Sequence, residues 1–245
     1  MTSDVPAAVR ALWGDSTGPR RGPKPAMSVR SIAATAVEIA DADGLAAVSM
    51  AAVAKRLGFT TMSLYRYVDT KDDLHLAMAE VALGAPPEPN RRRGWRGQLE
   101  EWARANLQTL TRHPWVIEIR LGGPPLGPGT LAWMEAGLQA LARTPLTGQQ
   151  AASCLLTVDG YVRNAVLLAQ QFADPDASAR WADRLRTVID RDAMPSLAAA
   201  LDGGVFEDDQ PTTSFPADDF DFGLGLVLDG IEHLVRGGAR SGVGP

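Results

Sequence analysis

The sequence has little of what disulfides, metal sites, membrane spans or β-sheets require. It contains one cysteine, Cys154, in 245 residues, so it can form neither an intramolecular disulfide nor a cysteine-rich zinc site. No apolar run approaches the ~18 residues of a membrane helix, and the run from Gly223 to Leu228 meets Asp229. The three histidines show no metal-ligand spacing. We therefore expect a cytoplasmic protein without a membrane segment, cofactor or metal.

Strand signals are also missing, because no run alternates Val, Ile or Thr with polar residues between turns. Helical periodicity recurs instead: between Thr147 and Phe172, apolar residues return every three or four positions. The stretch GAPPEPN (residues 84–90) interrupts this periodicity. The expected fold is all-α. Its expected parts are a flexible basic arm (1–27), a three-helix helix-turn-helix domain (28–83), a larger helical domain (91–236) and a flexible tail (237–245).

The most informative block is SMAAVAKRLGFTTMSLYRYVDTK, residues 49–71. It predicts two short helices joined at Gly58, because glycine readily adopts the left-handed turn that ends a helix. The apolar residues of both helices have the spacing of a helix-turn-helix, whose second helix enters the DNA major groove. A helical hairpin that binds no DNA would show the same periodicity and is the alternative. The outward residues of the second helix are Thr60, Thr61, Met62, Ser63, Tyr65 and Arg66.

These outward side chains have the chemistry that a DNA surface needs. Hydroxyl groups and the methionine methyl group suit base edges and thymine methyl groups, and Tyr65 and Arg66 suit phosphates. Lys71 adds a second indication, because it lies in the first turn of the next helix, where the helix dipole disfavours a cation. A cation is reasonable there if a phosphate binds the free amides of that turn.

The acidic net charge does not contradict this interpretation, because the charge is unevenly distributed. The chain carries a formal charge of −5, but acids and bases balance over residues 1–84, and the acidic excess follows them. The arm carries Arg20, Arg21 and Lys24, which could enter a minor groove and add salt-dependent affinity. A solvated tail that does not contact DNA is the alternative.

Residues 28–83 resemble the DNA-binding domain of the tetracycline-repressor (TetR) family of bacterial transcription regulators. The resemblance rests on an aliphatic first helix that ends in Asp-Gly, on SMAAVAKRLGF and on SLYRYVDTKDDL. The segment FDFGLGLVLDGIEHLV (220–235) is similar to the last helix of the family's C-terminal domain. The resemblance implies phosphate contacts by Ser49, Tyr65 and Lys71 and base contacts by residues 60–63. The full set of expected DNA-binding residues is Ser49, Thr60, Thr61, Met62, Ser63, Tyr65, Arg66, Tyr67 and Lys71.

The glycines near the C-terminus predict a homodimer. Gly223, Gly225 and Gly230 each weaken a helix by about 1 kcal/mol relative to alanine, which is tolerated where backbones approach closely. With the long helix 147–172, they predict two helices per subunit in a four-helix interface, an arrangement that the resemblance also implies. Packing within one chain is the alternative. A dimer would place its two recognition helices ~34–36 Å apart on a palindromic operator.

The resemblance also implies a small-molecule effector that binds the larger domain and shifts the DNA-reading helices. The tryptophans favour an aromatic or apolar effector. Tetracycline and Mg²⁺, which the family's founding members bind, are not expected, because their ligand side chains have no counterparts in IRLGGPPLGPG (119–129). Each candidate could instead be a core or surface residue. The candidates are Trp102, His113, Trp115, Trp133, Met134, Asn164 and Gln170, with Arg163 as an anion anchor.

Two other classes of protein are alternatives. An enzyme would need clustered catalytic groups, but Asp218, Asp219 and Asp221 lie in an acidic stretch without a base, and phosphate loops and His-Glu metal motifs are missing. A helical adaptor would use the same bundle for protein contacts only. We expect a DNA-binding transcriptional regulator, a repressor that binds its operator as a dimer and is released by a small-molecule effector.

Overall fold

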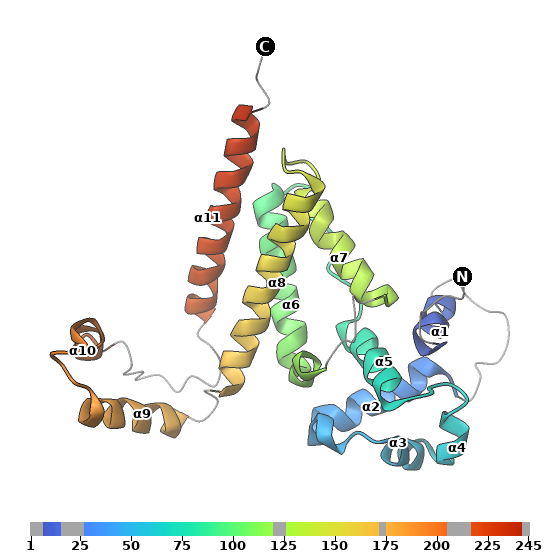
Figure 1. Ribbon diagram of the computed structural model, residues 1–245. Helices are drawn as coiled ribbons and strands as arrows, with labels where there is room; N and C mark the ends of the chain where they lie inside the picture. The colour runs from blue at the N-terminus through green and yellow to red at the C-terminus, as the bar shows by residue number, and fades with distance from the viewer. Residues whose placement is uncertain (1–6, 16–26, 120–125, 172–174, 205–216, 242–245) are drawn as a thin grey trace.

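The computed structural model describes residues 7–15, 27–119, 126–171, 175–204 and 217–241, and every regular element in these ranges is a helix (Figure 1). The all-α fold is thereby confirmed. None of these helices is long and apolar enough to cross a membrane. The helices are α1 (Ala7–Asp15), α2 (Val29–Asp43), α3 (Met50–Leu57), α4 (Thr61–Leu64), α5 (Lys71–Leu83), α6 (Trp95–Arg112), α7 (Pro128–Leu141), α8 (Gly148–Gln171), α9 (Pro175–Val188), α10 (Pro195–Asp202) and α11 (Ala217–Ser241), with short 3₁₀ segments η1 (Leu45–Ala47) and η2 (Pro114–Glu118).

Helices α1 to α5 form a small unit around α2. Ser28 begins α2 with a capping box: its hydroxyl accepts from the Ser31 amide, and the Ser31 hydroxyl accepts from the Ser28 amide. Ile32 and Ala36, one turn apart, are fully buried, and α2 packs against α3 and α5. The unit holds α3 and α4 at its outer end, away from the remaining helices (Figure 1).

Helix α1 corrects the expectation that residues 1–27 form a flexible arm. Residues 7–15 are helical, and Ala8 and Leu12, one turn apart, are buried. The helix packs against α2 and α5, and the Trp13 indole N–H donates to the Leu126 carbonyl at 2.9 Å. Its apolar pattern is too short to indicate a helix without knowledge of the surface that it covers. The basic residues of the expected arm, Arg20, Arg21 and Lys24, lie outside the described residues.

Helices α6, α7, α8 and α11 form an upright bundle, and α9 and α10 lie to one side of it (Figure 1). Helices α6, α7 and α8 contact one another pairwise, and α11 packs on α6 and α8. Leu99, Leu110 and Val158 are fully buried between them. Gly137 allows α7 to approach α8 closely, because a side chain there would overlap Leu155. The bundle therefore has one apolar core that joins all four helices.

Candidate nucleic-acid interface and ligand cavity

The turn between α3 and α4 has the geometry that the sequence predicts. The Ser49 hydroxyl caps α3 by accepting from the Ala52 amide at 3.1 Å. Gly58 ends the helix with φ 75° and ψ 26°, a left-handed conformation that strains any residue with a side chain. The Phe59 amide then donates to the Ala54 carbonyl at 3.0 Å. These local bonds turn the chain sharply into α4.

Helix α4 is shorter than the expected segment of about 60–68. Only Thr61–Leu64 is α-helical, and the chain continues in a turn in which the Tyr67 amide donates to the Leu64 carbonyl at 2.9 Å. Leu64 and Val68 are fully buried and anchor the segment to α2, α3 and α5 through the shared core. At its start, the hydroxyls of Thr60 and Ser63 hydrogen-bond each other at 2.9 Å, and the Ser63 amide donates to the Thr60 carbonyl at 3.0 Å.

The predicted base-reading side chains lie on an open face of this segment. Met62 is 75% exposed, which is unusual for a large apolar side chain, and Tyr65 is 44% exposed. Helix α4 lies at the outer end of its unit, away from the helices of the bundle (Figure 1). Among the remaining expected contacts, Ser49, Thr60, Arg66 and Lys71 are exposed, and Thr61, Ser63 and Tyr67 are partly buried.

Lys71 and Arg66 place two positive charges at this face, beside the exposed carboxylates of Asp69 and Asp72. Lys71 is the first residue of α5, directly after Thr70, whose hydroxyl accepts from the Asp73 amide at 3.0 Å in a capping box. In the described part of the chain, neither cation has a carboxylate within ion-pair distance, so both charges are available to phosphates. Burial lowers the pKa of His75, one turn along α5, and the charge of Lys71 lowers it further.

A cavity of about 480 Å³ lies between α6, α7 and α8, and we call it the α6–α8 cavity. Its wall is mainly apolar. The rings of Trp102 and Trp133 meet edge to face, with centroids 5.8 Å apart, and the Trp102 indole N–H donates to the Trp133 carbonyl at 2.9 Å. The size suits a small organic ligand. The lining residues are Leu83, Trp102, Asn106, Thr130, Trp133, Met134, Leu138, Ala152, Leu155, Leu156, Asp159 and Arg163.

Three polar residues of this cavity form one hydrogen-bonded cluster. The Asp159 carboxylate accepts from the Asn106 side-chain amide at 2.9 Å and from the Arg163 guanidinium at 2.7 Å. Asn106 is only 4% exposed, so its bond to Asp159 satisfies a buried polar group. The positive charge of Arg163 is already balanced by Asp159. The cluster therefore offers hydrogen bonds to a ligand more readily than a free positive charge.

The structure divides the residues that the sequence predicts for the ligand site. Trp102, Trp133, Met134 and Arg163 line the α6–α8 cavity. His113 and Trp115 lie outside it and bind Asp41 of α2, with His113 Nδ1 and Trp115 Nε1 at 2.8 and 2.7 Å from the same carboxylate oxygen. Asn164 and Gln170 lie outside it on the exposed surface of α8.

Sequence reasoning missed Asn106, Asp159 and Thr130. A signal exists for Asn106, which occupies a core-facing position of α6 between Trp102 and Leu110, at spacings of four. A polar residue in an apolar stripe needs a partner, and that partner lies 53 positions away on α8. Asp159 and Thr130 give no such signal in the sequence, because neither interrupts an apolar stripe. Each becomes part of a cavity wall only when α6, α7 and α8 pack together.

Glu80 connects the unit of helices α1 to α5, which we call the DNA-reading unit because it carries the side chains predicted to contact DNA, to the cavity wall. Its carboxylate, with the residue only 9% exposed, accepts from the Gly129 amide at 2.6 Å and from the amide and hydroxyl of Thr130, at the start of α7. Side chains at Gly127 or Gly129 would overlap this carboxylate. The Trp133 indole N–H donates to the carbonyls of Leu83 and Gly84, at 3.2 and 3.3 Å. Two cavity residues are thus bonded to the C-terminal end of α5, the helix that starts at Lys71.

Within the described ranges, no group of three or more His, Cys, Asp or Glu side chains lies close enough to hold a metal ion.

Comparison with known proteins identifies the family. The family "Bacterial regulatory proteins, tetR family" matches residues 32–78, and "Tetracyclin repressor-like, C-terminal domain" matches residues 86–235. The HTH-type transcriptional repressor DrrR1 of Streptomyces coeruleorubidus is 35% identical over 96% of this chain and 88% of its own length. An HTH-type transcriptional regulator of Saccharopolyspora erythraea is 30% identical over 98% of this chain and 96% of its own length.

Solved structures share the fold. The TetR family protein ActR of Streptomyces coelicolor, determined in complex with actinorhodin, matches with a TM-score of 0.69 and 26% identity, over 87% of this chain and 99% of that chain. The chain therefore belongs to the tetR family of bacterial regulatory proteins, which are helix-turn-helix DNA-binding transcription regulators and not enzymes.

Proposed function

We propose that the protein is a repressor that binds a palindromic operator as a homodimer and leaves it when a small molecule enters the α6–α8 cavity. The observation that carries this proposal is the open face of α4, with hydroxyl groups, Met62 and two cations that have no carboxylate partner in the described chain. The similarity to the repressor DrrR1 supports the sign of regulation. The ActR complex with actinorhodin supports a small-molecule effector.

In this proposal, residues 60–63 read base edges, and Ser49, Tyr65, Arg66 and Lys71 bind the phosphate backbone. Phosphate contacts fix the position of α4 in the groove, and base contacts select the sequence. The exposed methyl group of Met62 suits a thymine methyl group. Tyr67 is partly buried against the core, so its main contribution is to position the turn that carries Tyr65 and Arg66.

The dimer is proposed to form through the outer faces of α8 and α11. Phe222, Leu226 and Leu234 are 70%, 59% and 47% exposed and, with Gly230, form a stripe with a spacing of four along α11. A groove of about 450 Å³ lies beside this stripe, between α11 and α8. A twofold partner would cover an apolar stripe that a monomer leaves in water.

The three glycines of α11 divide between two surroundings. Gly223 faces Tyr161 of the same chain, and a side chain there would overlap the tyrosine ring, whose hydroxyl donates to the Phe220 carbonyl at 3.0 Å. Packing within one chain therefore explains why position 223 is a glycine, and Gly223 does not support the expected dimer interface. Gly225 and Gly230 face open space and remain consistent with close approach of a partner helix.

The effector is proposed to be a planar, largely apolar molecule with a few hydrogen-bonding groups. Its ring would pack on Trp102 and Trp133, and its polar groups would face Asn106, Asp159 and Arg163. Effector binding that shifts Trp133 or Thr130 would alter the bonds from these residues to α5. Because α5 begins at Lys71, a movement of α5 would change the position of the DNA-reading face. The size of the response would depend on how much more tightly the effector binds the protein with this face in one position than in the other.

The proposed DNA contacts are tested with a salt-dependent gel shift on the DNA upstream of the protein's own gene. Lys71→Gln should reduce affinity for all bound sequences and lower the slope of log K against log salt by about 0.9, because one phosphate contact is lost. Tyr65→Phe should reduce affinity without changing the slope, since no charge is removed. Arg92→Gln, the same change of charge at the far end of the bundle, is the control and should leave both values unchanged. Equal slopes for the Lys71 and Arg92 variants would contradict the phosphate role of Lys71.

A further inference from the structure

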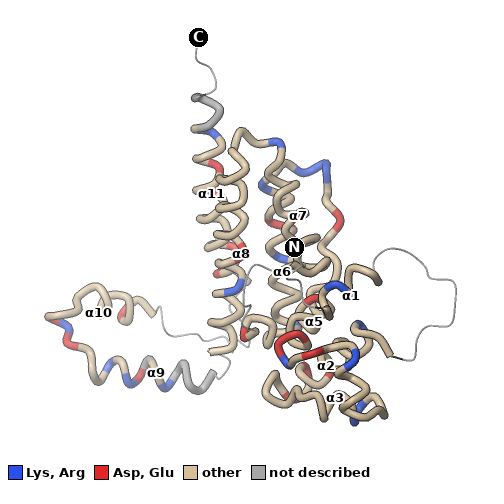
Figure 2. Tube along the Cα trace, turned by 45° about the vertical axis from the view of Figure 1, so that its right-hand side comes forward, with Lys and Arg blue, Asp and Glu red and all other residues tan. Residues whose placement is uncertain are grey.

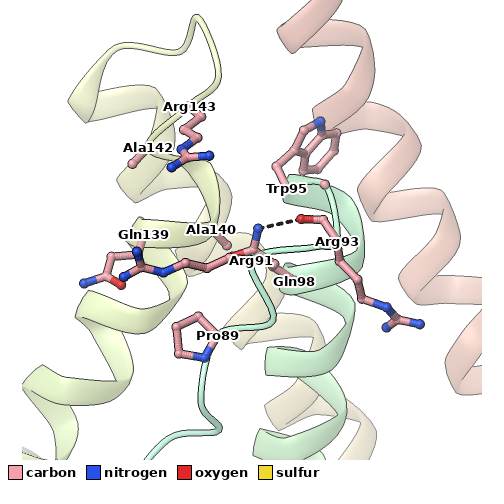
Figure 3. Close-up of a pocket in the computed structure, with 10 residues that line it drawn as sticks. Pro89, Arg91, Arg93, Trp95, Gln98, Gln139, Ala140, Ala142 and Arg143 are labelled. Carbon is pink, nitrogen blue, oxygen red and sulfur yellow. Dashed lines mark hydrogen bonds between the residues drawn. The ribbon is translucent and has the colours of Figure 1, made fainter.

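A second cavity, of about 470 Å³, lies where α6 begins and α7 ends, and we call it the arginine cavity (Figure 3). It shares no lining residue with the α6–α8 cavity. Because α6 runs toward the DNA-reading unit, its first turn lies at the end of the bundle remote from α4 (Figure 1). The lining residues are Pro89, Arg91, Arg93, Gly94, Trp95, Gln98, Gln139, Ala140, Ala142 and Arg143.

The charged residues that line this cavity are all arginines, and two neighbouring carboxylates, Glu101 and Glu135, are bonded to the lining residues Arg93 and Gln139. Three arginines and two glutamines line it, and none of its lining residues is acidic. Arg93 is paired with Glu101 at 2.9 Å, and its guanidinium points away from α7 in Figure 3. Arg91 extends toward Gln139 of α7, and Arg143 stands just beyond the end of the same helix (Figure 3). Neither Arg91 nor Arg143 has a carboxylate partner within the described ranges, although the whole chain carries a charge of −5.

The backbone adds to the positive potential. Helix α6 is 18 residues long, yet no side chain caps its first turn, which also contains no acidic residue. The free amides of such a turn attract anions, and Gly94 and Trp95 bring this turn to the cavity wall. The Gln98 side-chain amide donates to the Arg93 carbonyl at 2.8 Å, the bond drawn in Figure 3, and so holds the segment that carries Arg91.

We propose that the arginine cavity binds a small organic dianion, a phosphate monoester or a dicarboxylate, that carries a planar apolar group. Two unpaired guanidinium groups match two negative charges and present paired N–H donors to the oxygens. The partly buried indole of Trp95 provides a flat surface for the planar group. The side-chain amides of Gln98 and Gln139 already donate to the Arg93 carbonyl and to the Glu135 carboxylate, so the guanidinium groups supply the main polar contacts to the ligand. DNA bound at α4 is not the occupant, because the cavity lies at the opposite end of the bundle (Figure 1).

Basic segments gather at this end of the bundle in Figure 2, so the test must separate a site from general attraction of anions. Full-length protein is titrated calorimetrically with phenyl phosphate, with phthalate and with neutral phenol, at low and moderate salt. The double variant Arg91→Gln/Arg143→Gln removes the two free charges that line the cavity. Arg92→Gln removes a charge from the neighbouring residue, which does not line it, and serves as the matched control.

At least one of the two dianions should bind the unaltered protein and the Arg92→Gln variant with equal affinity. It should bind the double variant at least tenfold more weakly. The dianion that binds more tightly distinguishes a phosphate ligand from a dicarboxylate. Phenol should bind all three proteins equally weakly. Thermal unfolding of the variants verifies folding, and operator binding of the double variant should be unchanged. Failure of both dianions to bind the unaltered protein, or equal affinity for the double variant, would overturn the proposal.

Discussion

Replacing Glu80 by Gln tests the connection between the DNA-reading unit and the α6–α8 cavity. The Glu80 carboxylate accepts hydrogen bonds from the Gly129 amide and from Thr130 at the start of α7, in a nearly dry environment. Glutamine keeps one acceptor oxygen but removes the charge and turns an N–H₂ group toward backbone donors. Charge-assisted bonds contribute about 1.5–3 kcal/mol each, and the charge also interacts with the α7 dipole. We expect the start of α7 to lose about 2–3 kcal/mol of local stability.

Hydrogen exchange measures this loss directly. The amides of Gly129 and Thr130 should exchange about 30- to 100-fold faster in Glu80→Gln, since 1.4 kcal/mol corresponds to a factor of ten, while amides in the middle of α8 should keep their rates. Thermal unfolding should shift down by about 5–10 °C. Glu118→Gln makes the same change at an exposed carboxylate with no hydrogen-bond partner in the described chain and should alter neither quantity. Unchanged exchange at Gly129 and Thr130 in the Glu80 variant would refute the capping role.

Two further predictions concern α11. Gly223→Ala should destabilise the protein by about 1–3 kcal/mol in thermal or urea unfolding, because the new methyl group overlaps Tyr161. Gly148→Ala, at the start of α8 with no atom within 4 Å of the added methyl group, should be neutral or stabilise by up to about 1 kcal/mol. A loss of the same size at both positions would argue against the overlap. Leu226→Glu should abolish the proposed dimer in light scattering, because it places a charge in the apolar stripe, and Ala132→Glu on the exposed side of α7 should not. A dimer that persists in the Leu226 variant would exclude this interface.

The helix-turn-helix could be predicted because its determinants are close together in the sequence. Ser49 caps α3 three residues away, Gly58 ends it with a left-handed turn, and Thr70 caps α5 through Asp73. Inward apolar residues recur at helical spacing, so the opposite face of α4 had to be exposed. The end of α4 was less predictable, because the chain passes after Leu64 into a turn closed by the bond from the Tyr67 amide to the Leu64 carbonyl, and no glycine or proline between Tyr65 and Val68 marks this change.

The helical class, the ends of α3 and α5 and the side chains on the outer face of α4 follow from local sequence, since each depends on bonds and spacings within about four residues. The positions of the cavities depend on contacts between distant segments. Asn106 hydrogen-bonds Asp159, and Glu80 hydrogen-bonds Thr130, although about 50 positions of sequence separate the partners. His113 and Trp115 hydrogen-bond Asp41 and do not line the α6–α8 cavity. Helix α1 also depends on such contacts, because its short apolar face is stable only against α2 and α5. A cavity is the space that packed helices leave between them, and that space depends on the volumes and crossing of distant segments, which local patterns do not encode.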